Sequence, residues 1–329
     1  MQLSRGRILI TGGTGSLGTA LVDHIHSMGW ETQVTVLARN ESRMALFLKK
    51  YPWVRGEIGD VRDLDWLRTI IPGHDLVIHA AAIKQVPTAE SNVREAVLTN
   101  VIGSQNVAMA SVESGVTRVV GVSTDKACAP HTTYGATKYL MEGIFREANL
   151  WSKNTSFTLV RYGNVLRSNA SVVPLFEKQI ADDVPFTVTD PDMTRFWITM
   201  GDAVALIREA AALPIAGVVL VPRPGAMRMY DLCAALDPKR EIKIIGVRAG
   251  EKKHEVLIHE GEALHTSAIK NRFIIYPPDK LDRGNLPEGY CYSSASPDFV
   301  ITPAELYHML DSYNPYGGRE WMQNSAPKA

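Results

Sequence analysis

The stretch Arg7-Ile-Leu-Ile-Thr-Gly-Gly-Thr-Gly-Ser-Leu-Gly18 decides the fold that this sequence predicts. An apolar run is followed by glycines at positions 12, 15 and 18 and by an amphipathic pattern that continues to about Met28. A buried strand, a glycine loop and a helix in this order are typical of a dinucleotide-binding unit. Gly12 permits the tight turn, Gly15 lets the backbone approach a pyrophosphate, and Gly18 lets the helix pack closely. The first amides of the helix then point at the phosphates.

The rest of the first half of the chain repeats this alternation of β-rich and helical patterns. Strand patterns cover residues 33–38, 54–58, 75–79, 118–122 and 157–161, and helical patterns cover residues 90–114 and 134–150. Strands separated by helix-length segments imply parallel βαβ units. We therefore predict an α/β fold with a doubly wound, mostly parallel Rossmann sheet.

Proline, glycine and charged residues become more frequent after about residue 165. Residues 196–221 nevertheless read as a helix and a strand that return to the main sheet. We predict that the nucleotide-binding domain and a smaller C-terminal substrate-binding lobe are each assembled from separated segments. The predicted segments are 1–165 plus 196–222 for the Rossmann domain, 166–195 plus 223–312 for the lobe, and 313–329 for a flexible polar tail.

The composition of the 329 residues favours a soluble enzyme. Hydrophobic residues make up 45% and charged residues 21% of the chain, and 35 basic side chains balance 35 acidic ones. Because neither sign of charge dominates, we expect no nucleic-acid partner and no binding to an anionic membrane. The longest apolar stretch, residues 213–221, contains Pro214 and Gly217 and is too short to span a bilayer.

The three cysteines indicate a reducing compartment. Cys128, Cys233 and Cys291 lie far apart in no metal-ligand pattern, and their odd number argues against a disulfide framework. The first residues carry no apolar segment typical of a signal peptide. We therefore expect a cytoplasmic protein without a metal centre.

A second informative stretch follows the strand pattern that ends at residue 122. It reads Ser123-Thr-Asp-Lys126, and Tyr134 and Lys138 follow at the spacing of neighbours on one helix face. We expect the Lys138 ammonium to lower the pKa of Tyr134 toward neutrality, which makes the phenol a usable proton acceptor. A simple alcohol oxidation does not need Asp125 and Lys126, so this pair indicates further chemistry. The alternative is that these adjacent residues form an ordinary ion pair.

The end of the second strand pattern decides the nucleotide, because an acid there accepts from a ribose 2′-hydroxyl and a cation suits a 2′-phosphate. Arg39 occupies this position and Arg43 follows, which favours NADP over NAD, although Glu41 lies between them. Either arginine could instead be a solvated charge at a helix start. Asp60, after the third strand pattern, either accepts from the adenine amine or caps a turn.

Several motifs taken together resemble those of the extended short-chain dehydrogenase/reductases. They are the glycine stretch quoted above, Gly59-Asp-Val-Arg-Asp63, His79-Ala-Ala-Ala-Ile-Lys-Gln-Val-Pro87, Ser123-Thr-Asp-Lys-Ala127, Tyr134-Gly-Ala-Thr-Lys138, Arg161-Tyr-Gly-Asn-Val165, Met193-Thr-Arg-Phe-Trp-Ile198 and Gly250-Glu-Lys-Lys-His-Glu255. In this combination the chain resembles the UDP-N-acetylglucosamine 4,6-dehydratases of the polysaccharide biosynthesis group. Within them it is most similar to the soluble, C5-inverting branch of the pseudaminic acid pathway. The resemblance implies a UDP-sugar substrate and a homo-oligomer, either a dimer or a hexamer.

The resemblance also implies a reaction in three stages on the sugar. C4 is oxidised to a ketone, water is eliminated across C5 and C6, hydride returns to C6 and a proton returns to C5. The implied roles are O4 proton acceptor for Tyr134, O4 hydrogen bond for Thr124, ribose contact for Lys138, C5 base in its neutral form for Lys126, and protonated donor to the C6 hydroxyl for Asp125. Relatives that act on glucose nucleotides carry a glutamate where this chain has Lys126.

The remaining site residues are carried over from the same resemblance. The implied cofactor contacts are Gly12, Thr14, Gly15, Ser16, Leu17, Gly18, Arg39, Arg43, Asp60, Val61, Ala80, Ser123, Tyr134, Lys138 and Val165. The implied substrate contacts are Lys84, Asn164, Asn169, Arg195, Arg248 and Glu251. Arg195 and Arg248 suit a diphosphate, because a guanidinium fork matches phosphate oxygens. The loop after Val165 departs from the family pattern, since the arginine expected at Asn169 is replaced and Arg167 stands nearby.

Two other functions remain open at this point. A UDP-sugar 4-epimerase or reductase on the same fold needs no base for C5, so Asp125 and Lys126 argue against it. A catalytically silent NADP-binding regulator needs none of Thr124, Tyr134 and Lys138, so their presence argues against that reading.

Overall fold

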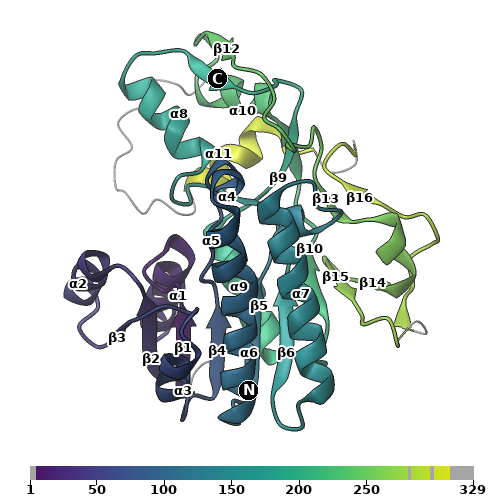
Figure 1. Ribbon diagram of the computed structural model, residues 1–329. Coiled ribbons are helices and arrows are strands. Elements are labelled where there is room, and N and C mark those ends of the chain that lie inside the picture. The colour runs from purple at the N-terminus through teal and green to yellow at the C-terminus, as the bar shows by residue number, and fades with distance from the viewer. Residues whose placement is uncertain (1–4, 281–282, 297–299, 312–329) are drawn as a thin grey trace. The chain divides into compact units, whose positions relative to one another are not determined.

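The computed structural model describes residues 5–280, 283–296 and 300–311, and the chain divides into two compact units (Figure 1). Unit 1 consists of Met1–Tyr162, Val204–Arg223 and Val256–Cys291. Unit 2 consists of Gly163–Ala203, Pro224–Glu255 and Tyr292–Ala329. The predicted tail, residues 313–329, lies outside the described residues.

Unit 1 is built on a nine-stranded sheet in which seven neighbouring strands are parallel. The parallel strands, from one edge, are β3 (Arg55–Ile58), β2 (Glu31–Ala38), β1 (Arg5–Thr11), β4 (Leu76–His79), β5 (Arg118–Val122), β6 (Ser156–Val160) and β10 (Val219–Pro222). Two antiparallel strands, β15 (Arg272–Ile275) and β14 (Thr266–Ile269), complete the other edge. The order 3-2-1-4-5-6 confirms the predicted doubly wound Rossmann sheet.

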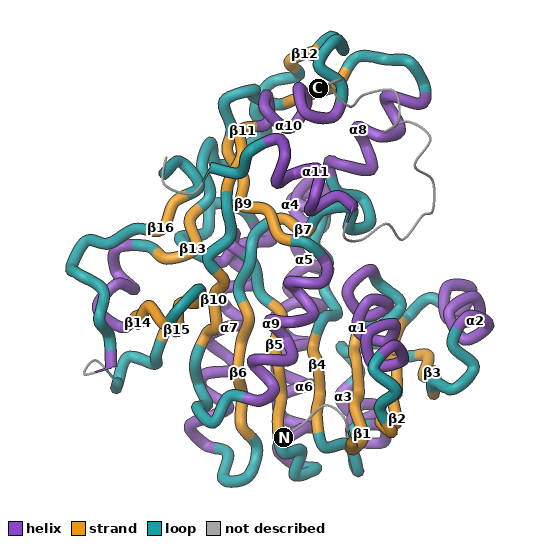
Figure 2. Tube along the Cα trace, turned by 180° about the vertical axis from the view of Figure 1, so that it is seen from behind, coloured by secondary structure: helices purple, strands orange, loops and turns teal. Residues whose placement is uncertain are grey.

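Helices cover both faces of this sheet, which is why its central strands are apolar without alternation. Ile8, Leu9 and Ile10 in β1 are at most 1% exposed. Figure 1 shows α6 (Gly103–Glu113) and α7 (Thr133–Trp151) over one face, and Figure 2 shows α1 (Ser16–Ser27) and α9 (Met200–Ala212) over the other. The remaining short helices of unit 1 are α2 (Glu41–Lys50), α3 (Leu64–Ile70), α4 (Val86–Ser91), α5 (Val93–Val97), the π-helical η1 (Leu98–Ile102) and the 3₁₀ helices η2 (Asp125–Ala127) and η3 (Glu260–His265).

Unit 2 has its own small sheet and apolar core. Its three-stranded sheet has the order β11 (Ala226–Arg228), β9 (Thr194–Ile198) and β7 (Asn164–Val165), and β8 (Phe186–Val188) pairs with β12 (Ile242–Ile244). Its helices are α8 (Val172–Ala181), α10 (Met229–Leu236) and α11 (Pro303–Asp311). Phe176, Trp197 and Leu232 are central to the core, with at most 1% exposure each.

The two largest differences between the predicted segment boundaries and those of the structure concern residues 256–291 and 196–203, and smaller differences fall at residues 163–165 and Arg223. Residues 256–291 were predicted to belong to the substrate lobe, but β14 and β15 in this segment extend the central sheet by backbone pairing with β10. Residues 196–203 were predicted to belong to the Rossmann domain, but β9 pairs with β7 and β11 of unit 2. In both cases strand pairing between distant segments, which local pattern does not reveal, decides the assignment.

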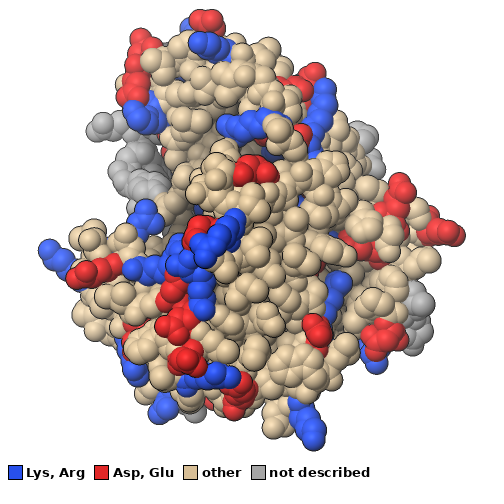
Figure 3. Space-filling model, in the orientation of Figure 1, with Lys and Arg blue, Asp and Glu red and all other residues tan. Residues whose placement is uncertain are grey.

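The charged surface is mixed in sign, as the balanced composition predicts. Figure 3 shows lysine and arginine interspersed with aspartate and glutamate over the face that it presents. Among the described residues, no helix combines the length and the apolar composition that a bilayer span requires.

Candidate active site

The glycine loop after β1 has the geometry of a nucleotide cradle. Gly12 has a φ of +70°, and a Cβ atom placed on it would lie 2.8 Å from the backbone of Ala81, so only glycine fits. A Cβ atom on Gly18 would lie 2.2 Å from the carbonyl oxygen of Gly13, so this glycine lets α1 pack against the loop itself. The glycine pattern predicts that Gly18 lets the helix pack closely on the sheet. In the structure, the closest contact of Gly18 is with the backbone of Gly13 in the loop.

The N-terminus of α1 fits a phosphate group. Gly15 precedes the helix and has no side chain that could cap it, and Ser16, Leu17 and Gly18 form the first turn. A Cβ atom on Gly15 would meet only the Gly12 carbonyl oxygen, at 3.1 Å. The first amides of a helix have no partner within it, and the helix dipole favours an anion there. Thr14 lies in the same loop.

The predicted adenosine contacts gather at the carboxyl ends of β2 and β3. The Arg39 guanidinium lies 3.7 Å from the Asp60 carboxylate, which Arg62 binds at 2.7 Å. Burial by itself raises the pKa of Asp60, but the hydrogen bonds and charge of Arg62 outweigh it, so the pKa is lowered and Asp60 remains an anion. Val61 is buried beneath Gly103 of α6. Arg43 lies in the first turn of α2, and its side chain is exposed.

The ends of β4 and β5 carry two further predicted cofactor contacts. The Ala80 amide donates to the carbonyl oxygen of Thr11, which places Ala80 beside the glycine loop. Ser123 follows β5, and its hydroxyl is buried and donates to Glu142 at 2.6 Å. The Ser123 side chain is thus held by α7.

The predicted catalytic residues Thr124, Asp125 and Lys126 meet in η2, immediately after β5. Lys126 Nζ lies 3.0 Å from Asp125 Oδ1, and the Thr124 hydroxyl donates to the same oxygen at 2.9 Å. The Asp125 side chain is fully buried, whereas that of Lys126 is 23% exposed. The structure thus contains the ion pair that sequence analysis kept as an alternative.

Tyr134 lies at the N-terminus of α7 and joins this cluster. The helix begins here because the Thr132 hydroxyl caps the Gly135 amide at 3.1 Å and Glu90 accepts from the Thr133 amide at 2.7 Å and its hydroxyl at 2.9 Å. The Tyr134 phenol hydrogen-bonds Thr124.

The predicted effect of Lys138 on Tyr134 was wrong. Burial raises the pKa of Tyr134 to about 12, and the charge of Lys126 and the hydrogen bond from Thr124 oppose this rise only in part. Lys138 is itself fully buried, with Nζ 2.8 Å from the Met141 sulfur. Burial lowers the pKa of Lys138 to about 7, and the charge of Glu142 opposes this fall only in part.

Asn100 is a site residue that sequence analysis missed. The predicted helix over residues 90–114 is interrupted by η1, and Asn100 of η1 binds both backbone groups of Ile83, at 2.8 and 3.0 Å, and the Thr137 hydroxyl at 3.0 Å. It therefore holds the segment before Lys84 against α7, between Tyr134 and Lys138. An amide inside an otherwise amphipathic helical pattern was the available signal. Lys84 itself is exposed in the loop between β4 and α4.

Three predicted substrate contacts meet in unit 2. Arg195 of β9 is buried and lies 3.1 Å from Glu251, which also accepts from the Arg248 amide at 3.4 Å. The Arg195 guanidinium donates in addition to the carbonyl oxygens of Thr194 and Lys253. Asn164 and Val165 are half-buried on the neighbouring strand β7.

The unusual loop after Val165 turns its arginine inward. Arg167 is 3% exposed, bonds Glu177 at 2.8 Å and donates to the carbonyl oxygen of Leu310. Its guanidinium is therefore part of the packing of unit 2. Asn169, at the position where relatives carry the arginine, is exposed.

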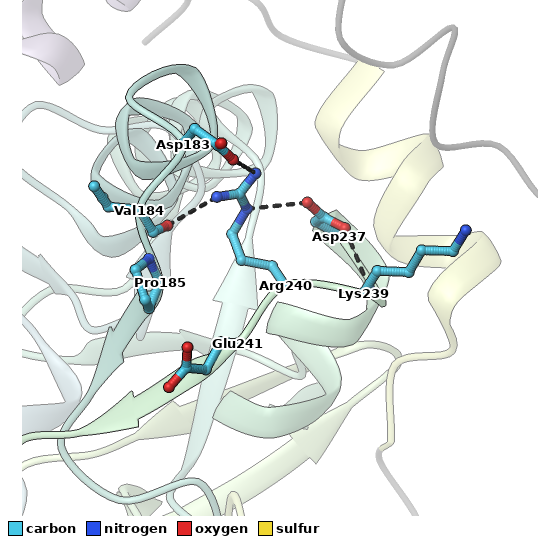
Figure 4. A pocket seen from close by; sticks show the side chains of 7 residues that line it. All are labelled: Asp183, Val184, Pro185, Asp237, Lys239, Arg240 and Glu241. Atoms are coloured by element: carbon cyan, nitrogen blue, oxygen red, sulfur yellow. Dashed lines mark hydrogen bonds and ion pairs between the residues drawn. The ribbon is translucent and has the colours of Figure 1, made fainter.

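A pocket of about 350 Å³ in unit 2 is lined by none of these residues (Figure 4). Arg240 crosses it and binds Asp237 at 3.0 Å, Asp183 at 3.3 Å and the Val184 carbonyl oxygen at 2.9 Å. Asp183 and Asp237 already neutralise the Arg240 guanidinium, and the three acids that line the pocket outnumber its two basic residues, so its charge does not favour an anion.

The parallel sheet, the glycine loop after β1 and the tyrosine and lysine of α7 define a Rossmann-fold protein of the short-chain dehydrogenase/reductase type. The model of the polysaccharide biosynthesis protein family matches residues 8–277, and the chain belongs to this family. It is 36% identical to the UDP-N-acetylglucosamine 4,6-dehydratase (inverting) of Campylobacter jejuni serotype O:2, over 94% of this chain and 98% of the relative. The enzyme of the same name from serotype O:23/36 is 40% identical over 92% and 97% of the two chains.

Two further similarities bear on fold and function. The UDP-glucose 4-epimerase of Rickettsia conorii is 37% identical over 84% of each chain. The solved structure of Pen from Bacillus thuringiensis has a TM-score of 0.88 and 32% identity, over 95% of this chain and 98% of that one.

Proposed function

We propose that this protein is an NADP-dependent UDP-N-acetylglucosamine 4,6-dehydratase that inverts C5. The observation that carries this proposal is the Asp125–Lys126 pair, with Nζ and Oδ1 3.0 Å apart, beside the Tyr134 phenol at the carboxyl end of β5. The identity of 36–40% to relatives named as inverting dehydratases supports it.

The ion pair matches the chemistry of elimination. Moving one proton from Lys126 to Asp125 converts the pair into a neutral amine and a neutral acid, without any proton from outside. The amine then takes the C5 proton and the acid protonates the departing C6 hydroxyl, so water leaves and the ion pair is restored. Burial of Asp125 favours the neutral form of a carboxylic acid, which makes this transfer accessible.

The C5 hydrogen becomes acidic only while C4 is a ketone. A nicotinamide, when bound, supplies this chemistry by taking hydride from C4 and returning it to C6. We assign the O4 proton to Tyr134, which must first give up its own phenolic proton, because burial raises its pKa to about 12 and keeps the phenol neutral. Thr124 and the charge of Lys126 stabilise the resulting phenolate, since both oppose the rise.

The residues around the glycine loop fit a dinucleotide. Gly12 and Gly18 leave no space for a Cβ atom, and the first amides of α1 suit a pyrophosphate. Arg62 is shared between Asp60 and Glu95, whereas Arg39 lies 3.7 Å from Asp60 with its side chain 52% exposed, so Arg39 is the cation that favours a 2′-phosphate and therefore NADP. Arg39→Ala should weaken NADP binding more than NAD binding in calorimetric titrations, and equal losses would contradict the NADP assignment.

The remaining contacts that the family resemblance implies are proposals of the same kind. Lys84, Asn164, Asn169, Arg195, Arg248 and Glu251 are the proposed contacts of the UDP-sugar. Arg195 and Arg248 provide the positive charge that a diphosphate needs. We further propose a cytoplasmic homo-oligomer, a dimer or a hexamer, in keeping with three free cysteines, of which Cys128 and Cys233 are buried.

The test is to incubate the protein with UDP-N-acetylglucosamine and NADP in deuterated water. Mass spectrometry should show the loss of one water, and NMR should show deuterium at C5 with the inverted configuration. Lys126→Ala should stop the elimination and leave C4 oxidation visible as nicotinamide absorbance. Equal loss of both steps in this variant would contradict a separate base.

A 4-epimerase is the second candidate, because the Rickettsia relative at 37% identity bears that name. Tyr134 and Lys138 suffice for oxidation and reduction at C4. In the same experiment an epimerase would leave the mass of the sugar nucleotide unchanged and would exchange configuration at C4 alone.

A further inference from the structure

A buried ion network lies beside α7, and its members come from three separated segments of unit 1. The Arg161 guanidinium is 1% exposed and binds the Glu142 carboxylate of α7 through two nitrogens, at 2.7 and 3.0 Å. Its other edge binds Glu262 of η3 through two contacts of 2.8 Å and donates to the Leu257 carbonyl oxygen at 3.0 Å. One guanidinium therefore holds two carboxylates.

The charges of this network do not balance by themselves. Arg161 stays protonated in a protein, and each ionised carboxylate contributes one negative charge. Although burial by itself raises the pKa of Glu262, the charge and hydrogen bonds of Arg161 outweigh it and hold the pKa below its usual value. One negative charge is thus left over beside Arg161 and Glu142, whose side chains are 1% and 3% exposed, and an uncompensated buried charge is costly.

Lys138 is placed to compensate it. Glu142 follows Lys138 by four residues on α7, so the two side chains share one face of the helix, and both are at most 3% exposed. Burial lowers the pKa of Lys138 to about 7, and the charge of Glu142 acts against this fall. Ser123 fixes the carboxylate by donating to Glu142 Oε1 at 2.6 Å.

Other titratable groups around Lys138 do not provide this negative charge. The titratable groups on α7 are Tyr134, Tyr139, Glu142, Arg146 and Glu147, and those on the elements packed against it are Glu90, Arg94, Glu95, Glu113, Asp125 and Lys126, with His79, Arg161 and Glu262 nearby. Of the other acids, Glu90 is bound to Thr133, Glu95 is paired with Arg62, Glu113 is paired with Arg68, and Glu147 is exposed. His79 is fully buried between Thr11 and Ser104, and burial lowers its pKa to about 3, so it is neutral. Tyr134 is also neutral, Asp125 is paired with Lys126, and Glu262 is paired with Arg161.

We propose that Glu142 is a positioning residue that keeps the buried Lys138 amine protonated. Its carboxylate binds Arg161 and Ser123 and lies one helical turn from Lys138, on which its charge acts without direct contact. This inference rests on the proposed function in one respect, since a charged Lys138 matters because it is proposed to hold the ribose of the cofactor. The charge itself can be measured without substrate.

Met141 provides the measurement, because its sulfur lies 2.8 Å from Lys138 Nζ. Full-length protein labelled with ¹³C-methyl methionine is titrated by NMR between about pH 5 and about pH 10, a range that brackets the amine. Met141→Leu identifies the signal among the 11 methionines. In Glu142→Gln we expect the midpoint of the Met141 shift to fall by about one pH unit, the order expected for loss of a nearby opposite charge.

Glu262→Gln is the matched control, because it removes a carboxylate from the other edge of the same guanidinium. We expect it to move the midpoint by less than half as much as Glu142→Gln. An unmoved midpoint in Glu142→Gln overturns the proposal, and so does an equal fall in both variants, which would be a general effect of the network.

If Glu142→Gln does not fold, the same titration of the Met141 signal is carried out on Glu142→Asp. Its carboxylate ends one methylene short, so we expect a smaller fall of the midpoint, and an unmoved or raised midpoint overturns the proposal. The parent protein itself is also tested for dehydration of UDP-N-acetylglucosamine. If it shows no dehydration while the midpoint falls as expected in Glu142→Gln, the role of Glu142 is supported and only the proposed function is contradicted.

Discussion

Two ion pairs lie beside helix α7, and they differ in whether a proton can leave them. Arg161 is 1% exposed, and its planar fork binds Glu142 and Glu262 through four contacts of 2.7 to 3.0 Å. Lys126 is 23% exposed and contacts Asp125 at 3.0 Å. A guanidinium keeps its proton throughout the pH range of a folded protein, whereas an amine loses its proton when water is withdrawn.

Unit 1 therefore contains one cation that keeps its proton, Arg161, and one that can give its proton to a neighbouring carboxylate, Lys126. Arg161 suits a structural role, because its two carboxylates depend on it for neutralisation. Lys126 and Asp125 suit acid–base chemistry, because one proton transfer neutralises both. The four predictions below test this separation, and they run from the largest expected effect to the smallest.

Replacing Lys126 should affect the rate of the reaction more strongly than the stability of the fold. In Lys126→Ala we expect the rate of deuterium incorporation at C5 to fall by about 10²–10⁴-fold, the usual contribution of a general base. The free energy of unfolding should fall by less than in Arg161→Met, because only one buried carboxylate, Asp125, loses its partner and it can become neutral by taking up a proton. Lys178→Ala, which breaks an exposed pair with Asp182, is the control and should leave the rate unchanged. If Lys126→Ala incorporates deuterium at C5 at the rate of the parent protein, Lys126 is not the base that removes the C5 proton.

Replacing Arg161 should do the reverse. In Arg161→Met we expect the free energy of unfolding in urea to fall by about 3–5 kcal/mol, because two buried carboxylates lose their partner. Arg68→Met is the matched control, since Arg68 binds Glu113 through two bonds of 2.8 and 2.9 Å on the surface, and it should lose at most about 1 kcal/mol. Similar losses in the two variants would remove the distinction drawn from burial.

The buried Lys138 should make stability depend on pH. Its pKa is lowered from 10.5 to about 7 in the folded protein, so between these values the unfolded chain binds more protons and stability rises with pH. From pH 7 to about pH 9 this group should add about 2 kcal/mol to the free energy of unfolding. Lys138→Met should lack this increase, and Lys153→Met, at an exposed lysine, should retain it. The same slope in all three proteins would show that Lys138 titrates normally.

The smallest expected effect concerns the start of α7. Glu90 accepts from the Thr133 amide at 2.7 Å and from its hydroxyl at 2.9 Å, and its charge favours the N-terminus of the helix. In Glu90→Gln we expect thermal unfolding to show a loss of about 1 kcal/mol. Glu147→Gln, at an exposed position of the same helix, should change stability by less than about 0.5 kcal/mol. An equal change in both variants would mean that Glu90 does not anchor α7.

The glycine loop and the grouping of Thr124, Asp125 and Lys126 could be predicted from sequence because their residues are near one another in the chain. Gly12 and Gly18 act within one turn, and Thr124 is the N-cap that immediately precedes Asp125 and Lys126 of η2. The parallel sheet was predictable for a related reason, since strands that alternate with helices can pair in few ways.

The electrostatics of the site were not predictable from the same residues. Helical spacing placed Tyr134 and Lys138 on one face and predicted a lowered pKa for the phenol, but burial raises the pKa of Tyr134 to about 12 and lowers that of Lys138 to about 7. The π-helical turn at Asn100 and the inward turn of Arg167 were missed for the same reason. Each depends on partners far away in the sequence.

Local pattern and short-range sterics were therefore enough to predict a doubly wound parallel sheet, the glycine loop after β1 and the consecutive acid and amine after β5. The tertiary structure was needed to show that β14 and β15 extend the central sheet, and that η3 brings Glu262 to the other edge of Arg161. It also decided which amines are buried. Burial and charge pairing are sums over all neighbouring segments, and those neighbours are defined only once the chain has folded.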